Sequence, residues 1–322
     1  FYLRFLFFSL FSYLIFEKFK NRILKLFFFS ALITIFIVGI DSYKQLITGV
    51  NFFGIIIQNI DRPSGLFREE YITGSFIARN TPLLLAIYFF LFFKNKTKNI
   101  YFLITLLLII NLFVIISGER AALVLISLVD VVFFILLPIR RIYKIISMLL
   151  LFSTVSCVLI FSDVARERMI NETYNQIFDG EEIYIFSKQH QSHYESAFEM
   201  FKDKPIFGQG VNTFRIYCSD EKFYINDLAC STHPHNSYVQ LLAETGLIGF
   251  LFLVIVYVRS IYEFIKLIKV RNKNYIVYSK LMLFLSVIVN FFPILPSNNF
   301  FNNWINIIYF LPLGFYLYLK NK

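Results

Sequence analysis

The chain has 322 residues, of which 57% are hydrophobic and only 16% charged, and its mean hydropathy is +0.65. This composition lies outside the range of soluble domains, and the scarcity of Gly, Pro and Cys excludes collagen-like, disordered and disulfide-scaffold proteins. Lys and Arg outnumber Asp and Glu by 31 to 21, which gives a net charge of +10. In a soluble protein such an excess favours nucleic-acid binding, but the placement of the charges here has another explanation.

Apolar stretches long enough to cross a membrane recur along the chain. A hydrocarbon core of ~30 Å needs a helix of ~20 residues. The stretch 100–116 is continuously apolar rather than alternating, which does not fit the strands of a membrane β-barrel. The sequence therefore predicts an all-α polytopic membrane protein with about nine transmembrane helices, at about 1–16, 23–40, 72–93, 100–117, 121–138, 145–162, 238–258, 276–296 and 304–319.

Basic residues are concentrated in alternate connections between these stretches. In the nine-span order every basic group falls on one side, which the positive-inside rule identifies as the cytoplasm. Solvated anchors at the membrane surface explain these charges without a nucleic-acid partner. The groups are Lys18, Lys20, Arg22 and Lys25; Lys94, Lys96 and Lys98; Arg140, Arg141 and Lys144; Arg259, Lys266, Lys269, Arg271, Lys273 and Lys280; and Lys320 and Lys322.

The opposite, outer side carries four connections and nearly all the acidic residues. These connections are 41–71, 117–120, 163–237 and 297–303. The segment 163–237 contains amphipathic stretches and a part punctuated by Pro and Gly, so we expect it to fold as an extracytoplasmic cap. The predicted organisation is six transmembrane helices in 1–162, including the outer loop 41–71, the cap in 163–237, and three further helices in 238–322.

The start of the chain is apolar and unusual for an N-terminus. It reads Phe-Tyr-Leu-Arg, without Met and without the pattern of a cleavable signal peptide. An odd number of predicted spans, with the N-terminus on the outer side, also indicates that earlier spans are missing. We therefore expect this chain to be a fragment of a longer protein whose earlier spans are missing.

The three cysteines fall into two environments. Cys157 lies in a predicted span, where a free thiol packs as a small hydrophobe. Cys218 and Cys230 share the outer segment, and a disulfide between them would close a short loop in a compartment that permits oxidation. Two free thiols or a metal pair are the alternatives.

The strongest candidate for chemistry is the polar stretch between the cap and the seventh span. His235 is a candidate general base, because imidazole titrates near neutral pH and can accept a proton from a hydroxyl group. Asn236 follows it directly and is a candidate to orient this base or its substrate. Two alternatives are a metal site that uses His233 and His235, for which no third ligand is evident, and a structural histidine that caps the following helix.

Arginines on the outer side form a second candidate site. Arg120 follows a very short turn between two spans, where an arginine is costly unless it faces the interior of the bundle. Arg62, Arg68 and Arg79 flank or enter the third span, and guanidinium groups suit phosphate oxygens. The alternatives are that these arginines extend to the membrane surface, or that Arg120 pairs with Glu119. Glu244 is a candidate partner of His235 or of an arginine, or a surface charge.

Four motifs resemble those of the O-antigen ligase and O-antigen polymerase superfamily of membrane glycosyltransferases. The family's His-Asn pair, followed nine residues later by Gly-x-x-Gly, is matched by His235-Asn236 and Gly246-Leu-Ile-Gly249. Its Pro-x-x-Gly-x-Gly turn, Arg-x-x-Gly-x-Phe motif and Ser-x-x-Arg hairpin are matched by residues 205–210, 62–67 and 117–120. The motifs extend over most of the chain. The family has about a dozen spans, so this chain departs from it at the N-terminal side.

The resemblance implies transfer of a glycan from a polyprenyl-diphosphate carrier to a hydroxyl acceptor, on the periplasmic side of the bacterial inner membrane. In that scheme His235 deprotonates the acceptor while Arg120, with Arg62 or Arg79, binds the pyrophosphate, and the anomeric configuration is inverted without a metal or other cofactor. The motif spacing favours ligation to lipid A-core; polymerisation of the glycan and transfer to a protein hydroxyl are the alternatives. A lipid-linked sugar transporter or flippase is the alternative of another class, but the sequence shows no internal repeat.

Overall fold

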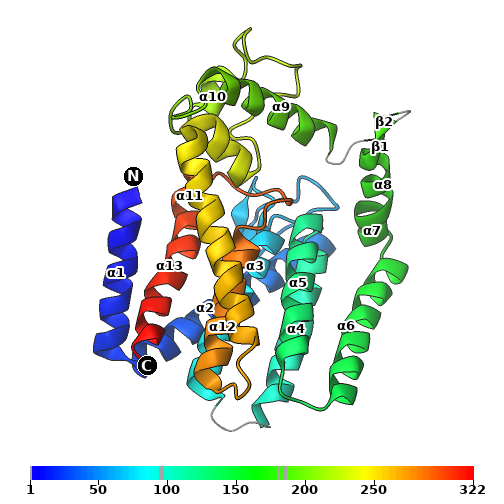
Figure 1. Ribbon diagram of the computed structural model, residues 1–322. Coiled ribbons are helices and arrows are strands. Elements are labelled where there is room, and N and C mark those ends of the chain that lie inside the picture. Colours follow the sequence, from blue (N-terminus) through cyan, green and yellow to red (C-terminus); the bar gives the residue numbers. More distant parts are fainter. Residues whose placement is uncertain (1, 94–97, 180–181, 184–186) are drawn as a thin grey trace. The chain divides into compact units, whose positions relative to one another are not determined.

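The structure is a computed structural model that describes residues 2–93, 98–179, 182–183 and 187–322 (Figure 1). The described residues are mostly helical, as the continuous apolar stretches predict, and the strand pair seen among them is short and antiparallel. The elements up to the sixth long helix are α1 (Tyr2–Phe19), α2 (Asn21–Thr48), η1 (Gly65–Phe67), α3 (Thr73–Phe92), α4 (Lys98–Ile116), α5 (Arg120–Leu136) and α6 (Arg141–Phe161). The remainder are α7 (Asp163–Arg166), η2 (Glu167–Asn171), α8 (Glu172–Ile177), β1 (Phe178–Asp179), β2 (Glu182–Ile183), α9 (Lys188–Asp203), α10 (Phe214–Tyr217), α11 (Ser237–Ile268), α12 (Tyr275–Asn290) and α13 (Asn303–Lys320).

Four of the described helices, α2, α3, α6 and α11, are long and apolar enough to cross a membrane. The apolar helices Ile100–Ile116 and α12 are shorter. On α6, Leu149, Phe152 and Phe161 are each more than half exposed within the chain, as expected for a helix that faces lipid. This is the architecture of a multi-pass membrane protein, and the number of nine spans stays a prediction.

Most helix ends lie within a few residues of the predicted ones. Three ends differ more: α11 continues ten residues beyond its predicted end to Ile268, α12 ends at Asn290 instead of near 296, and α2 is longer than predicted. The helix α2 was expected over 23–40 but extends to Thr48, because it continues into the predicted outer loop. It ends at Gly49, whose left-handed φ of 75° is the usual way to terminate a helix. Of the second basic group, Lys94 and Lys96 lie outside the described residues.

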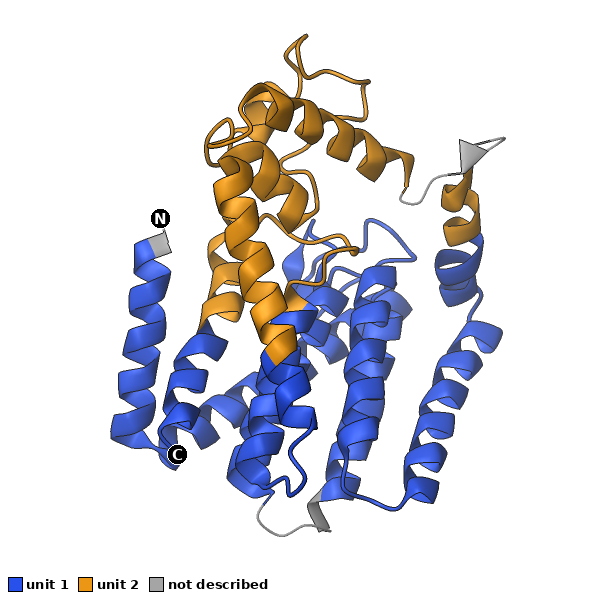
Figure 2. Ribbon diagram, in the orientation of Figure 1, with its two compact units in different colours: residues 1–171, 263–289, 311–322 blue, residues 172–262, 290–310 orange. Residues whose placement is uncertain are grey.

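Contacts divide the chain into two compact units (Figure 2). Unit 1 contains residues 1–171, 263–289 and 311–322, and unit 2 contains residues 172–262 and 290–310. These units follow contacts rather than the sides of a membrane, so the predicted division into 1–162, 163–237 and 238–322 stays a prediction.

In unit 1, α3 forms the centre of the packing. It contacts α2, α4 and α5, and most of its residues are buried. Aromatic rings fill the spaces between these helices: Phe89 of α3 stacks on Tyr278 of α12 with ring centroids 5.4 Å apart. On α6 the expectation for Cys157 was wrong in part, because this residue lies in the helix but is exposed on its lipid-facing surface instead of being packed inside the protein.

Unit 2 has a small core of its own beneath α9 and α10. The disulfide Cys218–Cys230, with Cα atoms 5.2 Å apart, connects the end of α10 to the segment that precedes α11. The disulfide therefore ties the approach to His235 to the unit's interior. The buried residues of this core are Ala197, Met200, Phe214, Cys218, Phe223 and Ala243.

The helix α11 is interrupted at Gly246. This residue has φ 62° and ψ −160°, values that are not helical, so α11 consists of a short first part and a longer second part. The sequence predicted an uninterrupted span over 238–258. Hydropathy does not show the break, because the apolar composition continues through it.

Candidate functional site

The first part of α11 is held in place by its own starting residue and by the segment before α13. The side-chain oxygen of Asn236 accepts hydrogen bonds from the backbone N–H groups of Tyr238 (2.9 Å) and Val239 (3.2 Å), which is an N-cap. Its amide donates to the backbone oxygen of Pro293 (2.8 Å). The alternative of a capping histidine is therefore wrong, since Asn236 makes the cap and is buried while doing so.

His235 is the residue just before this cap, and its backbone is unusual. Its φ of 57° lies in the left-handed region, where residues other than Gly, Asn and Asp are uncommon. The backbone oxygen of His235 accepts a hydrogen bond from Ser297 N (2.8 Å), which holds this conformation. The ring Nε2 lies 3.1 Å from the hydroxyl of Ser231. Strained backbone of this kind clusters at functional sites.

The three other histidines of the chain lie around His235. The ring centroid of His233 is 4.1 Å from that of His235, His193 is stacked at 5.4 Å, and His190 is at 5.5 Å. His190 and His193 come from α9 and were missed by the sequence reasoning, which considered only His233 and His235. Their spacing of three residues puts both on one face of a helix, and this was the available signal.

Burial keeps His193, His233 and His235 neutral. Burial, together with the repulsion that a charged His235 would meet from His233, His190 and His193, lowers the pKa of His235 to about 3. Burial likewise lowers the pKa values of His193 and His233 to about 4. At pH 7 His235 is therefore an uncharged hydrogen-bond acceptor. Among the described residues, no group of three or more His, Cys, Asp or Glu side chains has the geometry to hold a metal ion.

The two glycine motifs of unit 2 form one structure. At the break in α11, a Cβ on Gly246 would lie 2.4 Å from the backbone of Ile206, and a Cβ on Gly208 would lie 2.4 Å from the backbone of Glu244. Backbone hydrogen bonds that the helix loses at the break are replaced by bonds to the turn 205–210. They join Gln209 N to Ala243 O (2.9 Å), Gly210 N to Glu244 O (2.9 Å) and Leu247 N to Pro205 O (2.8 Å).

Glu244 contributes to this structure through its side chain. It accepts hydrogen bonds from the backbone N–H groups of Asn212 and Phe214, both at 3.0 Å, and from the amide of Gln240 at 3.2 Å. The structure thus places Glu244 on the segment 212–214 at the start of α10. These are backbone and amide contacts, whereas the sequence left open His235, an arginine or a surface position for Glu244, which is in fact buried.

In unit 1, the loop that carries Arg62 packs on polar residues of α2. Asp41 accepts hydrogen bonds from Asn51 (3.1 Å), and Gln45 accepts one from the backbone of Gly65 (2.7 Å). Gly118, in the turn between α4 and α5, lies so close to this loop that a Cβ there would be 2.1 Å from the backbone oxygen of Asp61. The Arg-x-x-Gly-x-Phe and Ser-x-x-Arg motifs are therefore in direct contact.

Glu119 fixes the start of α3 beside this turn. Its buried carboxylate accepts hydrogen bonds from Gly74 N (2.6 Å) and from the backbone and hydroxyl (2.6 Å) of Ser75. Burial raises the pKa of Glu119, and the charge of Arg62 opposes that effect. Glu119 thus acts as a cap for the first backbone N–H groups of α3.

Three arginines gather around the turn, and we call Arg62, Arg120 and Arg168 the arginine cluster. Burial, together with the charges of Arg120 and Arg62, lowers the pKa of Arg168 to about 10. Its Nε donates to the backbone oxygen of Gly118 (3.4 Å). The guanidinium of Arg62 lies 4.7 Å from the centre of the Tyr71 ring. Like charges brought together with partial loss of water favour an anionic ligand.

The structure separates the remaining predicted arginines by environment. Arg79 is 3% exposed inside α3, whereas Arg68 is exposed at the end of η1 with a left-handed φ of 57°. Arg168 was missed by the sequence reasoning, because in the sequence it is one of several charges in a long polar segment. Only the fold of η2 brings it to the turn after α4.

Comparison with known proteins finds a similarity in the central part of the chain. Residues 103–254 match the family model described as O-Antigen ligase. The matched region, a little under half of the chain, contains Arg120, Arg168, all four histidines and both glycine motifs of unit 2. A search of curated proteins finds no significant match.

Proposed function

We propose, from the match of residues 103–254 to the O-antigen ligase family model, that this protein transfers a glycan from a polyprenyl-diphosphate carrier to a hydroxyl acceptor. The proposed location is the bacterial inner membrane, with the reacting groups facing the periplasm. The acceptor that the motif spacing favours is lipid A-core, which makes the protein an O-antigen ligase.

The proposed base is His235. It takes the proton of the acceptor hydroxyl, whose oxygen attacks the anomeric carbon of the donor while the bond to the pyrophosphate breaks. The electron pair of that bond leaves with the pyrophosphate. Direct displacement inverts the anomeric configuration, and the scheme uses no metal or other cofactor. The observation that supports this role most is the neutral imidazole held in a left-handed backbone conformation among three further histidines.

The arginine cluster is the proposed binding site for the donor pyrophosphate. Arg79, which lies in α3, is a further candidate for binding the pyrophosphate. A planar guanidinium binds two phosphate oxygens at once, and its fixed charge stabilises the negative charge that develops on the leaving group. The pKa of Arg168, even when lowered to about 10, leaves this residue charged at pH 7. Arg68 and Asn236 are kept as supporting residues.

The transport alternative has one observation in its favour. Transporters contain membrane helices broken at glycine, and α11 is broken at Gly246. Here, however, the turn 205–210 binds the free backbone groups of the break, whereas in transporters such groups face a substrate cavity. In His235→Ala, unimpaired donor binding with lost transfer supports the enzyme, while unchanged transfer removes His235 from its role.

The acceptor class is tested by reconstitution. The full-length protein in proteoliposomes is given a lipid-linked glycan together with lipid A-core, a glycan of the same repeat, or a protein with accessible Ser and Thr. Product with lipid A-core alone supports ligation, and product with either other acceptor identifies a polymerase or a protein O-oligosaccharyltransferase. Retention of the anomeric configuration in the product would contradict direct displacement.

A further inference from the structure

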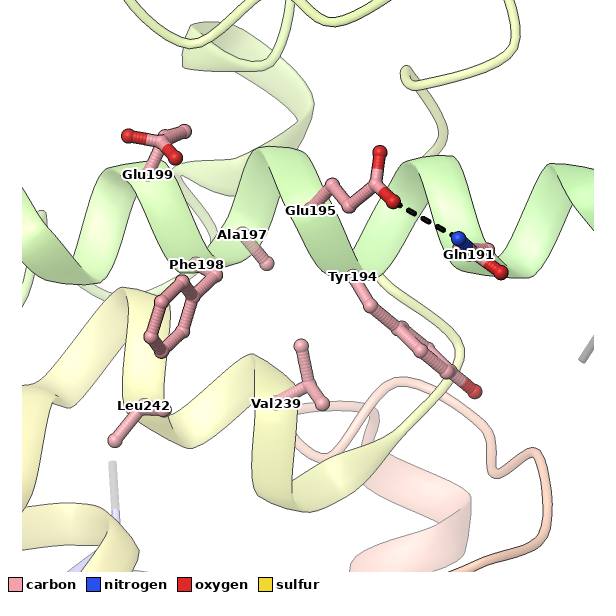
Figure 3. A pocket seen from close by; sticks show the side chains of 8 residues that line it. All are labelled: Gln191, Tyr194, Glu195, Ala197, Phe198, Glu199, Val239 and Leu242. Carbon is pink, nitrogen blue, oxygen red and sulfur yellow. Dashed lines mark hydrogen bonds between the residues drawn. The ribbon is translucent and has the colours of Figure 1, made fainter. Parts of the chain in front are cut away.

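A pocket of about 450 Å³ lies between α9 and the first part of α11, entirely within unit 2 (Figure 3). Its apolar wall is formed by Tyr194 and Phe198 of α9 and by Val239 and Leu242 of α11. Figure 3 shows the two aromatic side chains extending from α9 toward the α11 residues. Polar residues of α9 complete its lining.

The aromatic side chains are not explained by the core of the unit. Tyr194 and Phe198 are four residues apart and so lie on one helix face, and neither belongs to the buried core under α9. Phe198 is 48% exposed. Two partly exposed rings that line a concave site are a typical platform for the apolar face of a ligand.

The polar residues follow the edge of α9 beside these rings. Gln191 donates a hydrogen bond to Glu195 (3.0 Å), which presents an amide and a carboxylate side by side (Figure 3). Glu199 is paired with Lys202 (2.6 Å), whose ammonium group also lies 5.0 Å from the centre of the Phe198 ring. Glu195 is thus a carboxylate whose partner is a neutral amide, and it gives this edge a negative charge.

This combination fits a sugar ring better than the other substrates of a lipid-linked reaction. A pyranose has an apolar C–H face for an aromatic ring and hydroxyl groups for an amide and a carboxylate. The negative charge of Glu195 would repel a phosphate group. An isoprenyl chain would displace water from the carboxylate of Glu195 without offering it a hydrogen bond, which costs free energy. The chemistry of the edge therefore selects a neutral or amine-bearing carbohydrate.

The pocket is connected to the histidine cluster through Tyr194. Its hydroxyl interacts with the side chain of Asn236, and its ring centroid lies 6.4 Å from that of His190. His190 in turn is 5.5 Å from His235. A ligand seated on Tyr194 would thus contact a side chain that itself lies next to His190.

We propose that this pocket binds a neutral or amine-bearing sugar ring of the acceptor, stacked on Tyr194 and Phe198 with its hydroxyl groups on Gln191 and Glu195. This inference rests on the proposed function, because it assigns the ring to the acceptor. It predicts that the acceptor is recognised through carbohydrate, which separates glycan-bearing acceptors from a bare protein hydroxyl.

Direct binding is measured first, without donor, so that the result does not depend on transfer. Saturation-transfer NMR on the full chain in nanodiscs uses methyl glucoside, methyl glucosaminide, glucose 6-phosphate and farnesol as probes. We expect signals from the first two sugars, a weaker signal from the sugar phosphate, and loss of the sugar signals in Phe198→Ala. In Glu195→Gln the sugar phosphate should gain signal relative to the glucoside.

Two matched controls keep the result specific. Phe207→Ala removes another exposed aromatic of unit 2, and Glu221→Gln removes another exposed carboxylate of the same segment. Neither should change the sugar signals. Sugar binding that is unchanged in Phe198→Ala, or farnesol that displaces the glucoside, would overturn the proposal.

Transfer kinetics then test the assignment to the acceptor. Phe198→Ala should raise the acceptor KM about tenfold, the loss expected for one stacked ring, with kcat and the donor KM within about twofold of the parent. A raised donor KM with an unchanged acceptor KM would overturn the assignment. Absence of transfer in the parent would instead contradict the proposed function and leave the binding result standing.

Discussion

His235 shows how burial decides what a residue can do. Burial lowers its pKa to about 3, far below the usual value near 6.5, so it remains neutral throughout the pH range of a periplasm. A base with so low a pKa accepts a proton only late in a reaction, when the acceptor oxygen has largely bonded to the anomeric carbon. This fits glycosyl transfer, whose transition state develops charge on the sugar before the new bond is complete.

The pH dependence of transfer follows from this pKa. Because His235 is neutral from pH 8 down to about 5, kcat/KM should be flat over that range and fall only in more acidic solution. The measurement is transfer rate against pH with saturating donor. An acid limb with an apparent pKa near 6.5 would contradict the burial of the base.

The free energy of unfolding should also decrease in acidic solution, because of the buried histidines. The pKa values of His193, His233 and His235 are lowered in the folded state, so the unfolded chain binds more protons below pH 6.5. The free energy of unfolding is therefore constant above about pH 6.5 and decreases as the pH falls toward 4. Thermal unfolding midpoints of the parent and of His193→Phe should differ in slope over this interval. Equal slopes would count against His193 as a coupled group.

Arg120 tests the role of the guanidinium. Arg120→Lys keeps the charge but loses the planar fork, so a bidentate pyrophosphate contact should weaken and the donor KM should rise roughly tenfold or more. Arg120→Ala should do at least as much harm. Arg140→Lys, just before the start of α6, is the control and should have no effect. If Arg120→Lys folds and transfers glycan at the parent rate, Arg120 does not bind the donor pyrophosphate through its guanidinium. The proposed binding site would then consist of Arg62, Arg79 and Arg168.

At the scale of elements, the two glycine motifs of unit 2 act as a pair. Gly208 and Gly246 both have positive φ values, 67° and 62°, and each faces the backbone of the other's segment. A side chain introduced at either glycine would clash with backbone atoms, which cannot move aside as a flexible side chain can. The spacing of the motifs therefore reflects a backbone contact that holds the residues from Asn236 to Glu244 in place.

Alanine substitution measures that contact. Gly208→Ala and Gly246→Ala should each lower the free energy of unfolding by roughly 2–4 kcal/mol, because backbone strain and a backbone clash add together. Gly54→Ala is the matched control, since Gly54 has φ 82° but no atom within 4 Å of the added Cβ. It should cost about 1 kcal/mol, from strain alone. Thermal unfolding in nanodiscs gives all three values, and equal losses would show that the contact contributes nothing.

The disulfide is a second element-scale constraint. Cys218–Cys230 closes a loop with a sequence separation of 12, which stabilises a fold by about 3 kcal/mol in the loop-entropy description. Cys230→Ser should lower the unfolding midpoint and abolish the mobility difference between reduced and non-reduced protein. Cys157→Ser, on the exposed face of α6, should change neither.

At the scale of the whole molecule, the sequence predicts what local composition determines. The helices follow from continuous apolar stretches, and most of their ends lie close to the predicted ones. His190, His193 and Arg168 could not be assigned in the same way, because their roles depend on contacts with residues far away in the sequence. The break in α11 could not be predicted for a related reason. Leu247 and Ile248 continue the apolar pattern of the helix, while the hydrogen bonds that compensate the break come from the distant turn near Pro205.

The break at Gly246 also fixes a length. The second part of α11, residues 247–268, is about 33 Å long at ~1.5 Å per residue, close to the ~30 Å thickness of a hydrocarbon core. The first part of α11, which follows His235, would then lie outside the hydrocarbon core, at the membrane interface. The height of the histidine cluster above the lipid would thus be set by the bilayer itself. In vesicles of longer-chain lipids the second part is too short for the hydrocarbon core, so the bilayer around it must become thinner. The transfer rate should therefore change with acyl chain length. The transfer rate of Gly208→Ala, in which the turn no longer holds the break, should change less.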